Sequence, residues 1–330
     1  MPARSMIGLL LLLVACSSTP RTERVTVPPG ATFSQVIDTL AGHGLVGWRP
    51  WFKLVARLRR LDRNVKAGVY EFSPGSGTWG VLSTLQSGRV AVVRLTVPEG
   101  LTILEVADLA AARLGFPRES LISAARDSAE AAALGVQRPT LEGFLLPETY
   151  QLPLGATARE VVHAMTLEFK HAWNPAWDAR LDSMQLTRVQ LLALASIVEG
   201  EARHDEERPI IAGVYVNRLR IGMPLQADPT VQYAIQLKTG ERKPRLYYKD
   251  YAIPSPYNTY LNPGLPPGPV NSPGIKSIRA AIFPATVPFL YFVAEPDGHH
   301  LFSRTLAEHD AATGLLRRAE RKAAAKNGKP

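Results

Sequence analysis

The sequence contains a single cysteine, Cys16, so no disulfide can form within the chain. It has no apolar run of the roughly 20 residues that a membrane-spanning helix requires. Neither the cysteine and histidine spacing of a zinc finger nor the aromatic motif of an RNA-binding sheet occurs. These absences exclude a fold held by internal disulfides and argue against nucleic acid as a partner.

The composition is that of a globular protein with a strong positive charge. The chain has 330 residues, of which 46% are hydrophobic, and this length suits two or three compact units. The formal net charge is +9, and segment 317–329 is especially basic. A positive surface attracts anions, so we expect a membrane surface or an acidic wall polymer as partner. A solvated, frayed helix end is the alternative interpretation of the basic tail.

The first residues have the pattern of an export signal. Arg4 precedes a short apolar run at 6–14, and small residues follow it around Cys16. Segment 13–16, Leu-Val-Ala-Cys, looks like a bacterial lipobox, which predicts a lipidated Cys16 after a signal at 1–16 and before a linker at 17–24. An ordinary signal, cleaved or uncleaved, is the alternative. Either interpretation places the rest of the chain outside the cytoplasm, in the bacterial envelope. We expect it on the periplasmic side of the inner membrane.

An internal repeat follows, in which residues 25–38 match residues 95–108. Each copy predicts a short strand, a turn with proline and glycine, a threonine N-cap at Thr32 or Thr102, and an amphipathic helix. This order resembles a LysM-like module, a small carbohydrate-binding fold, and we assign it to region 25–155. A spacer without binding function is the alternative.

Between the copies, alternation predicts strands at 67–72 and 92–97. Trp48, Trp51 and Phe52 are expected to pack into a small core, because large aromatic residues dominate core packing. A surface on which sugar rings stack is the alternative for these three residues.

The second half of the chain, 156–330, predicts mostly helices around one long loop. Segment 251–273 is rich in proline, glycine, asparagine and tyrosine, and a long irregular loop in a compact domain is often a binding loop. Asp205 is expected to cap the helix that follows it. The expected elements are helices at 161–173, 180–184, 187–201, 205–222 and from 272 onward, and a hairpin at 289–302.

The most informative segment is 187–201, which predicts a buried central helix. Thr187 and Gln190 form a capping-box pattern, and the residues that follow are apolar on most sides. Glu199 shares a face with this apolar stripe, whereas Glu201 points to another face. A carboxyl group in apolar surroundings has a raised pKa and can act as a general acid near neutral pH. The alternative is that both glutamates end the helix in solvent.

Several ordered motifs accompany this helix. The first is 195–202, Ala-Ser-Ile-Val-Glu-Gly-Glu-Ala, and it is followed by motifs at 214–231, 257–260, 264–269, 291–294 and 298–302. Together they resemble the endolytic murein transglycosylases of the MltG (YceG-like) family, over about the last half of the chain. The resemblance implies an α+β protein, in which LysM-like βα modules precede a mixed α/β catalytic domain at 156–330 with a central buried helix.

The resemblance implies an enzyme that cleaves nascent peptidoglycan strands internally and needs no cofactor. Glu199 would protonate the MurNAc–GlcNAc glycosidic oxygen and then accept the proton of the MurNAc C6 hydroxyl, which gives a 1,6-anhydro sugar. It also implies coupling to a peptidoglycan synthase. The candidate substrate-binding residues are Gln226, Asn217, Arg218, Tyr257, Asn258, Asp228 and His300.

Other roles for these residues, and other functions for the protein, are considered as alternatives. Asp228 is expected to cap the helix that begins at Pro229. If Asp228 were a base instead, the protein would be an inverting hydrolase. A lysozyme-like hydrolase, which would leave reducing ends, is an alternative function. A noncatalytic wall-binding scaffold is a further alternative. His299, His300 and His309 do not have the spacing of a metal site, so no metal is expected. The chain departs from the resembled family at its start, because family members usually carry a transmembrane helix there.

Overall fold

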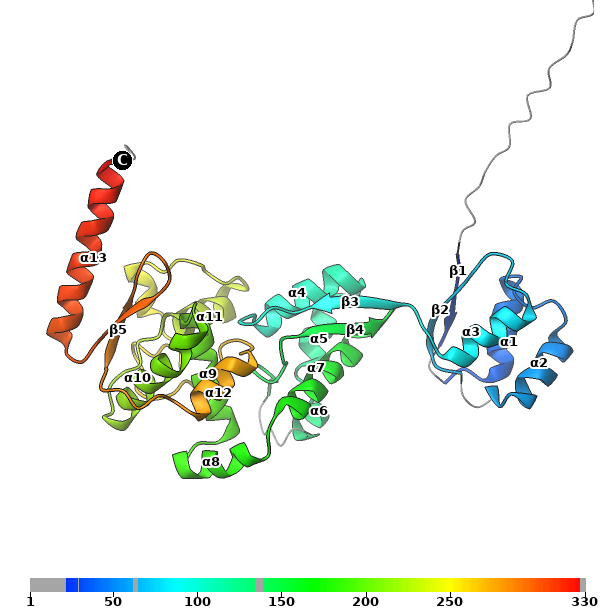
Figure 1. The fold of residues 1–330 in the computed structure, drawn as a ribbon, viewed down its shortest axis with the longest axis horizontal. Coiled ribbons are helices and arrows are strands. Elements are labelled where there is room, and N and C mark those ends of the chain that lie inside the picture. The colour runs from blue at the N-terminus through cyan, green and yellow to red at the C-terminus, as the bar shows by residue number, and fades with distance from the viewer. Residues whose placement is uncertain (1–21, 29, 62–64, 134–138, 327–330) are drawn as a thin grey trace, which may run out of the picture. The chain divides into compact units, whose positions relative to one another are not determined.

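The computed structural model describes residues 22–28, 30–61, 65–133 and 139–326. The predicted signal with Cys16, most of the predicted linker, and the end of the basic tail lie outside the described residues. Two compact units make up the chain (Figure 1). Unit 1 comprises Met1–Val92 and Pro153–Gly155, and unit 2 comprises Val93–Leu152 and Ala156–Pro330. No described helix is long and apolar enough to cross a membrane.

Unit 1 packs three helices with one antiparallel strand pair, and the first copy of the repeat forms as predicted. The Thr32 hydroxyl accepts the N–H of Gln35, and the Gln35 side chain in turn accepts the N–H of Thr32. Val25 pairs with Tyr70 across the two strands, and both are fully buried. The elements are β1 (Glu23–Val27), α1 (Phe33–Gly42), α2 (Arg49–Leu58), β2 (Gly68–Phe72) and α3 (Thr78–Ser87).

The predicted packing of the aromatic cluster in unit 1 is right for one residue and wrong for two. Phe52 is 1% exposed, but Trp48 is 70% and Trp51 is 44% exposed. The buried stripe of α2 consists of Phe52, Val55 and Ala56. Trp51 lies beyond the edge of this stripe and Trp48 is the N-cap residue, so neither reaches the core.

Unit 2 contains the second copy of the repeat and all the elements after it. Thr102 and Glu105 form the predicted capping box, and β3 pairs with β4. The sequence interpretation grouped residues 25–155, whereas the contacts join the second copy to unit 2. The elements are β3 (Val92–Thr96), α4 (Ile103–Leu114), α5 (Arg118–Ala124), α6 (Ser128–Ala133), β4 (Thr149–Pro153), α7 (Ala158–Ala172), α8 (Ala176–Met184), α9 (Arg188–Glu201), η2 (Asp205–Glu207), α10 (Arg208–Arg220), α11 (Asp228–Thr239), η3 (Tyr248–Ala252), α12 (Ile275–Ile282), β5 (Tyr291–Ala294), β6 (His300–Ser303) and α13 (Leu306–Lys326). Helices and small sheets therefore form a mixed α/β architecture, as predicted.

Helix α9 is the centre of unit 2. Its residues 191–198 are all buried, and it contacts α8, α10, α11 and α12. The capping box of Thr187 with Gln190 is present, as predicted. The helix ends at Glu201, because the next residue, Ala202, is in an extended conformation. A helix buried on all sides can hold the groups at its end rigidly.

The long loop before α12 is attached to the middle of α9. Between η3 and α12 the chain forms neither helix nor strand, as predicted. The buried hydroxyl of Ser196 accepts the N–H of Val270 at 3.0 Å. The amide of Asn271 donates to the carbonyl oxygen of Ser196 at 2.9 Å. The loop and the helix therefore meet through side-chain hydrogen bonds rather than through a sheet.

Asp205 does not have the predicted role of a helix cap. It lies inside the short 3₁₀ helix η2, and α10 begins three residues later at Arg208. Its carboxylate accepts a hydrogen bond from Arg208 Nε at 3.0 Å. The side chain is therefore engaged by an ion pair and not by backbone N–H groups.

Candidate active site

The last turn of α9 presents Glu199 and Glu201 to different surroundings, as their spacing predicts. The Glu199 side chain is 6% exposed, so it is buried as expected. One of its oxygens lies 3.1 Å from Nη1 of Arg208, and the other accepts the N–H of Gly274 at 3.0 Å. Glu199 is therefore an ion-paired carboxylate rather than an acid in apolar surroundings.

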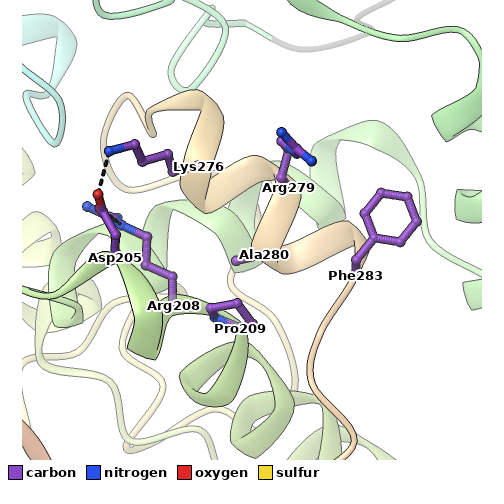
Figure 2. A pocket seen from close by; sticks show the side chains of 7 residues that line it. All are labelled: Asp205, Arg208, Pro209, Lys276, Arg279, Ala280 and Phe283. Carbon is purple, nitrogen blue, oxygen red and sulfur yellow. Dashed lines mark hydrogen bonds and ion pairs between the residues drawn. The ribbon is translucent and has the colours of Figure 1, made fainter.

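Arg208 connects Glu199 to a wider charge network. Its guanidinium is 8% exposed and also contacts Asp205 and Glu99, the latter at 3.9 Å. Lys276 from α12 pairs with Asp205 (Figure 2). Burial and the negative charge of Glu199 raise the pKa of Glu99. On this side of α9, the buried charges of Arg208 and Glu199 thus neutralise each other, and more exposed charges surround the pair.

Glu201, two residues further on, has the property that the sequence led us to expect of Glu199. The hydroxyl of Tyr215 donates to Glu201 Oε1 at 3.0 Å. Burial, reinforced by the nearby charge of Asp228, raises the pKa of Glu201 to about 7. Burial and Glu201 also raise the pKa of Tyr215, so its phenol stays protonated and remains a donor. Glu201 can therefore both release and accept a proton near neutral pH.

A cavity of about 500 Å³ opens beside Glu201. It brings together four of the predicted site residues, Arg218, Gln226, Asp228 and His300. The cavity is lined by Glu201, Tyr215, Arg218, Gln226, Asp228, Tyr260, Tyr291, Phe292, Val293, Ala294, His300, Leu306, His309 and Asp310. Glu199 is not among these described lining residues, so the predicted grouping of polar residues exists around Glu201 instead.

Asp228 is held in the cavity wall by tyrosines rather than by a helix terminus. It is the first residue of α11, and the N-cap residue of this helix is Ala227, so the predicted capping role of Asp228 is wrong. Tyr260 donates its hydroxyl to Asp228 Oδ1 at 2.7 Å, and Tyr251 reaches Oδ2 at 3.4 Å. The backbone N–H of Asp228 donates to Glu201. The second carboxylate is therefore fixed next to the first.

Gln226 lines the cavity, and its backbone has a conformation that residues other than glycine rarely adopt. Its φ is +49°, in the left-handed region. Its backbone N–H donates to the carbonyl of Thr259 at 3.1 Å, which ties it to the long loop. Backbone strain of this kind concentrates at functional sites, where the surrounding structure maintains it.

Arg218 and His300 line the cavity but are also engaged with the protein. Arg218 donates to the carbonyls of Leu290 at 2.7 Å and Leu225 at 2.6 Å. His300 Nδ1 lies 2.7 Å from an oxygen of Glu207, which also accepts the His300 N–H. Both side chains therefore fix the hairpin and the adjacent loop while facing the cavity.

The other three predicted binding residues hold the framework and are not among the described residues that line the cavity. The Asn217 amide donates to the carbonyls of Val287 at 2.8 Å and Phe289 at 3.0 Å. Asn258 is fully buried and donates to two carbonyls of its own loop. Tyr257 packs edge-on against Tyr233, with ring centroids 4.9 Å apart.

The sequence interpretation did not include three side chains that line the cavity, Glu201, Tyr215 and Tyr260. Tyr260 is the last residue of the motif 257–260, whose first two residues are the predicted candidates. Tyr215 precedes the predicted Asn217 by two positions, and Glu201 was visible in the motif 195–202. Only the direction in which each side chain points separates these residues from their neighbours, and that direction depends on the packing of distant elements.

A group of potential metal ligands lies apart from the cavity lining. Among the described residues, His204, Glu206 and His299 place their ligand atoms within 4.8 Å of one another. The two imidazole rings stack with centroids 3.7 Å apart. Two imidazoles and a carboxylate suit zinc by donor type. The sequence interpretation considered a different set of residues, His299, His300 and His309.

Comparison with known proteins gives consistent results. The model of the YceG-like family matches residues 25–314. An endolytic murein transglycosylase of Bacillus subtilis (strain 168) is 30% identical over 306 residues, covering 88% of this chain and 84% of that protein. An endolytic murein transglycosylase of Streptococcus pneumoniae serotype 2 is 30% identical over 328 residues, covering 91% and 59%. The crystal structure of a yceG-like protein from Listeria monocytogenes superposes with a TM-score of 0.60 at 31% identity, covering 89% of this chain and 100% of that one.

Proposed function

Because this chain belongs to the YceG-like family, we propose that it is an endolytic murein transglycosylase that cleaves peptidoglycan strands internally. The relatives that carry this name are similar over most of the chain. The observation that carries the proposal is the cavity beside Glu201, because it combines a carboxyl group that titrates near neutral pH with a second, tyrosine-held carboxylate.

In the proposed reaction, protonated Glu201 donates its proton to the glycosidic oxygen between MurNAc and GlcNAc. The bond from that oxygen to C1 of MurNAc breaks, and C1 develops oxocarbenium character. The C6 hydroxyl of the same MurNAc then attacks C1, and the Glu201 carboxylate accepts its proton. The products are a free 4-hydroxyl on GlcNAc and a 1,6-anhydroMurNAc end, with Glu201 protonated again.

The surrounding groups support this cycle. Asp228 favours the protonated form of Glu201 by charge repulsion, and its own charge can stabilise the positive sugar. Tyr215 donates a hydrogen bond that stabilises the carboxylate form in the second half of the cycle. Gln226 and His300 are proposed to bind sugar hydroxyls or the N-acetyl group, and Arg218 to face the lactyl or stem-peptide carboxylates.

The proposal assigns to Glu201 the acid role that the sequence interpretation gave to Glu199. Glu199 is paired with Arg208, and removing it is expected to disturb folding more than chemistry. The decisive experiment digests uncrosslinked glycan strands with wild type, Glu201→Gln and Glu199→Gln, and identifies the products by mass spectrometry. Circular dichroism of each variant shows whether it is folded.

The expected result is internal fragments with 1,6-anhydroMurNAc ends from wild type and Glu199→Gln, and none from folded Glu201→Gln. Activity that survives in Glu201→Gln but not in folded Glu199→Gln would return the acid role to Glu199. Reducing MurNAc ends would show that water attacks C1, which makes the protein a hydrolase with Asp228 as the candidate base.

Three further features belong to the same proposal. The strand, turn and helix copies at 25–38 and 95–108 are proposed to be LysM-like modules that bind glycan. Cys16 is proposed to carry the lipid anchor that holds the chain at the periplasmic side of the inner membrane. A peptidoglycan synthase is the proposed partner, since terminating a growing strand requires access to it. Metabolic labelling with a fatty-acid analogue tests the anchor, with Cys16→Ser as its control.

A further inference from the structure

Unit 1 exposes an unusual amount of apolar surface along α2. Trp48, Trp51, Leu54 and Leu58 are 70%, 44%, 52% and 77% exposed. Their spacing of three, three and four residues places them along one side of the helix. Large exposed apolar patches are rare on soluble proteins and mark interaction sites. We call these four side chains, with Trp79, the tryptophan patch.

Trp79, at the start of α3, extends the patch beyond α2. It is 57% exposed, and the guanidinium of Arg59 lies over its ring, 5.0 Å from the centroid. Arg59 also donates to Gln86 of α3 at 3.2 Å. Since Arg59 directly follows α2, these contacts hold Trp79 beside the C-terminal end of that helix.

A row of cations accompanies the patch. Segment 48–61 contains no acidic residue. Asp38 pairs with Arg49 at 2.9 Å, through a contact that leaves both side chains more than half exposed. The helix therefore carries an apolar stripe and a positive stripe side by side on its outer half. The exposed cations are Arg49, Lys53, Arg57, Arg59 and Arg60.

We propose that the tryptophan patch docks on the surface of an anionic phospholipid bilayer. Trp48, Trp51 and Trp79 would occupy the headgroup region, which tryptophan prefers because its ring is apolar and its N–H is polar. The cations would contact lipid phosphates, as in amphipathic helices that lie in the plane of the interface. This inference is independent of the proposed reaction and of the proposed lipid anchor.

The two leucines distinguish a bilayer from a glycan. Tryptophan rings can stack on sugars, but Leu54 and Leu58 gain little from a sugar ring and gain much from acyl chains, into which aliphatic groups transfer favourably. Leu58 is the most exposed residue of the patch, and it lies next to Arg57 and Arg59. An aliphatic tip between two cations fits the boundary between acyl chains and phosphates.

The experiment uses the full chain with Cys16→Ser, so that no acyl chain contributes. Vesicles of phosphatidylethanolamine and phosphatidylglycerol are compared with vesicles of phosphatidylcholine in a sedimentation assay. The patch variant is Trp48→Ser/Trp51→Ser/Leu58→Ser. The control variant is Ile221→Ser/Leu237→Ser/Leu261→Ser, which removes three side chains of unit 2 that are 61%, 53% and 55% exposed.

The patch variant is expected to bind the anionic vesicles at least tenfold more weakly than the parent, and the control variant equally well. Tryptophan emission of the parent should shift to shorter wavelength only with anionic vesicles, and high salt should reverse the binding. Equal vesicle binding by the patch variant and the parent would overturn the proposal. Loss of binding to isolated peptidoglycan with unchanged vesicle binding would also overturn it and assign the patch to glycan.

Discussion

The two sides of the last turn of α9 carry the same residue type in opposite electrostatic settings. On one side, Glu199 faces the guanidinium of Arg208 at 3.1 Å and a backbone N–H. On the other, Glu201 faces a tyrosine hydroxyl and a second carboxylate, Asp228. Both side chains are largely removed from solvent, so exposure alone does not distinguish them. The sign of the nearest charge does, and it is the basis on which we propose Glu201 as the acid.

The largest expected effect concerns catalysis by Glu201. Glu201→Gln keeps the shape and the hydrogen bond of the side chain but has no transferable proton. We expect the rate of strand cleavage to fall about 100- to 10,000-fold, the range for loss of a general acid. Single-turnover digestion of glycan strands measures this rate. If Glu201→Gln kept more than a tenth of the wild-type rate, Glu201 would not be the general acid, and the proposed difference between the two glutamates would be wrong.

The next largest effect concerns the contribution of the ion pair between Glu199 and Arg208 to the stability of the protein. Arg208→Met leaves Glu199 buried without its cation, which we expect to lower the free energy of unfolding by about 3–5 kcal/mol. Arg279→Met is the matched control, because Arg279 is exposed and lines the same hollow as Arg208 (Figure 2). It should change the free energy by less than about 0.5 kcal/mol. Urea denaturation measures both, and equal effects would contradict the importance of the buried pair.

The stability of the protein should depend on pH through Glu201. The folded pKa of Glu201 is raised to about 7, so the folded state binds more protons than the unfolded state between about pH 4.5 and 7. The contribution of Glu201 to the free energy of unfolding therefore falls as pH rises through that window. Glu201→Gln removes this loss and should be more stable than wild type at pH 8.

Thermal unfolding of wild type and Glu201→Gln at pH 5 and pH 8 measures this dependence. The gain in the free energy of unfolding of Glu201→Gln relative to wild type should be largest at pH 8 and small at pH 5.

Asp228→Asn should lower the pKa of Glu201, because it removes a negative charge, and shift the alkaline limb of the pH–rate profile to lower pH. A profile that stays in place would show that Asp228 does not set the proton affinity of Glu201.

The smallest expected effect concerns strain at Gln226. Gln226→Gly relieves a positive φ and should stabilise the protein by up to about 1 kcal/mol while lowering cleavage activity. Gln185→Gly is the control, since Gln185 has a φ of +57° at the end of α8 and is not among the described residues of the cavity lining. It should give a similar gain without loss of activity. Equal activity of both variants would show that Gln226 has no role in the site.

Local hydrogen bonds made much of the fold predictable from the sequence. The capping boxes that begin at Thr32, Thr102 and Thr187 link residues three positions apart, so the chain specifies them without tertiary contacts. The burial of α9 was equally readable, because its apolar residues leave no polar face. The family resemblance then supplied the fold and the class of reaction.

The site was less predictable, because its chemistry depends on pairs distant in sequence. Glu199 and Glu201 cannot be ranked without the positions of Arg208 and Asp228, which belong to other helices. Asp228 illustrates the same limit: a residue before a proline has the local pattern of a cap, but tyrosines from the long loop hold it. Trp48 and Trp51 were misassigned because aromatic residues suit both cores and interfaces.

The hydroxyl of Ser196 does for this protein part of what a cross-link does elsewhere. The only cysteine is Cys16, so the long loop cannot be tied to α9 by a covalent bond. The buried hydroxyl oxygen of Ser196 accepts the N–H of Val270 and donates to the carbonyl of Ala193. Together with the bond from the Asn271 amide to the Ser196 carbonyl, it fastens the loop to the helix that carries Glu201. Unlike a disulfide, this fastening is indifferent to the redox state of its surroundings. The segment that leads into α12 is thus attached to α9 by hydrogen bonds and not by a covalent bond.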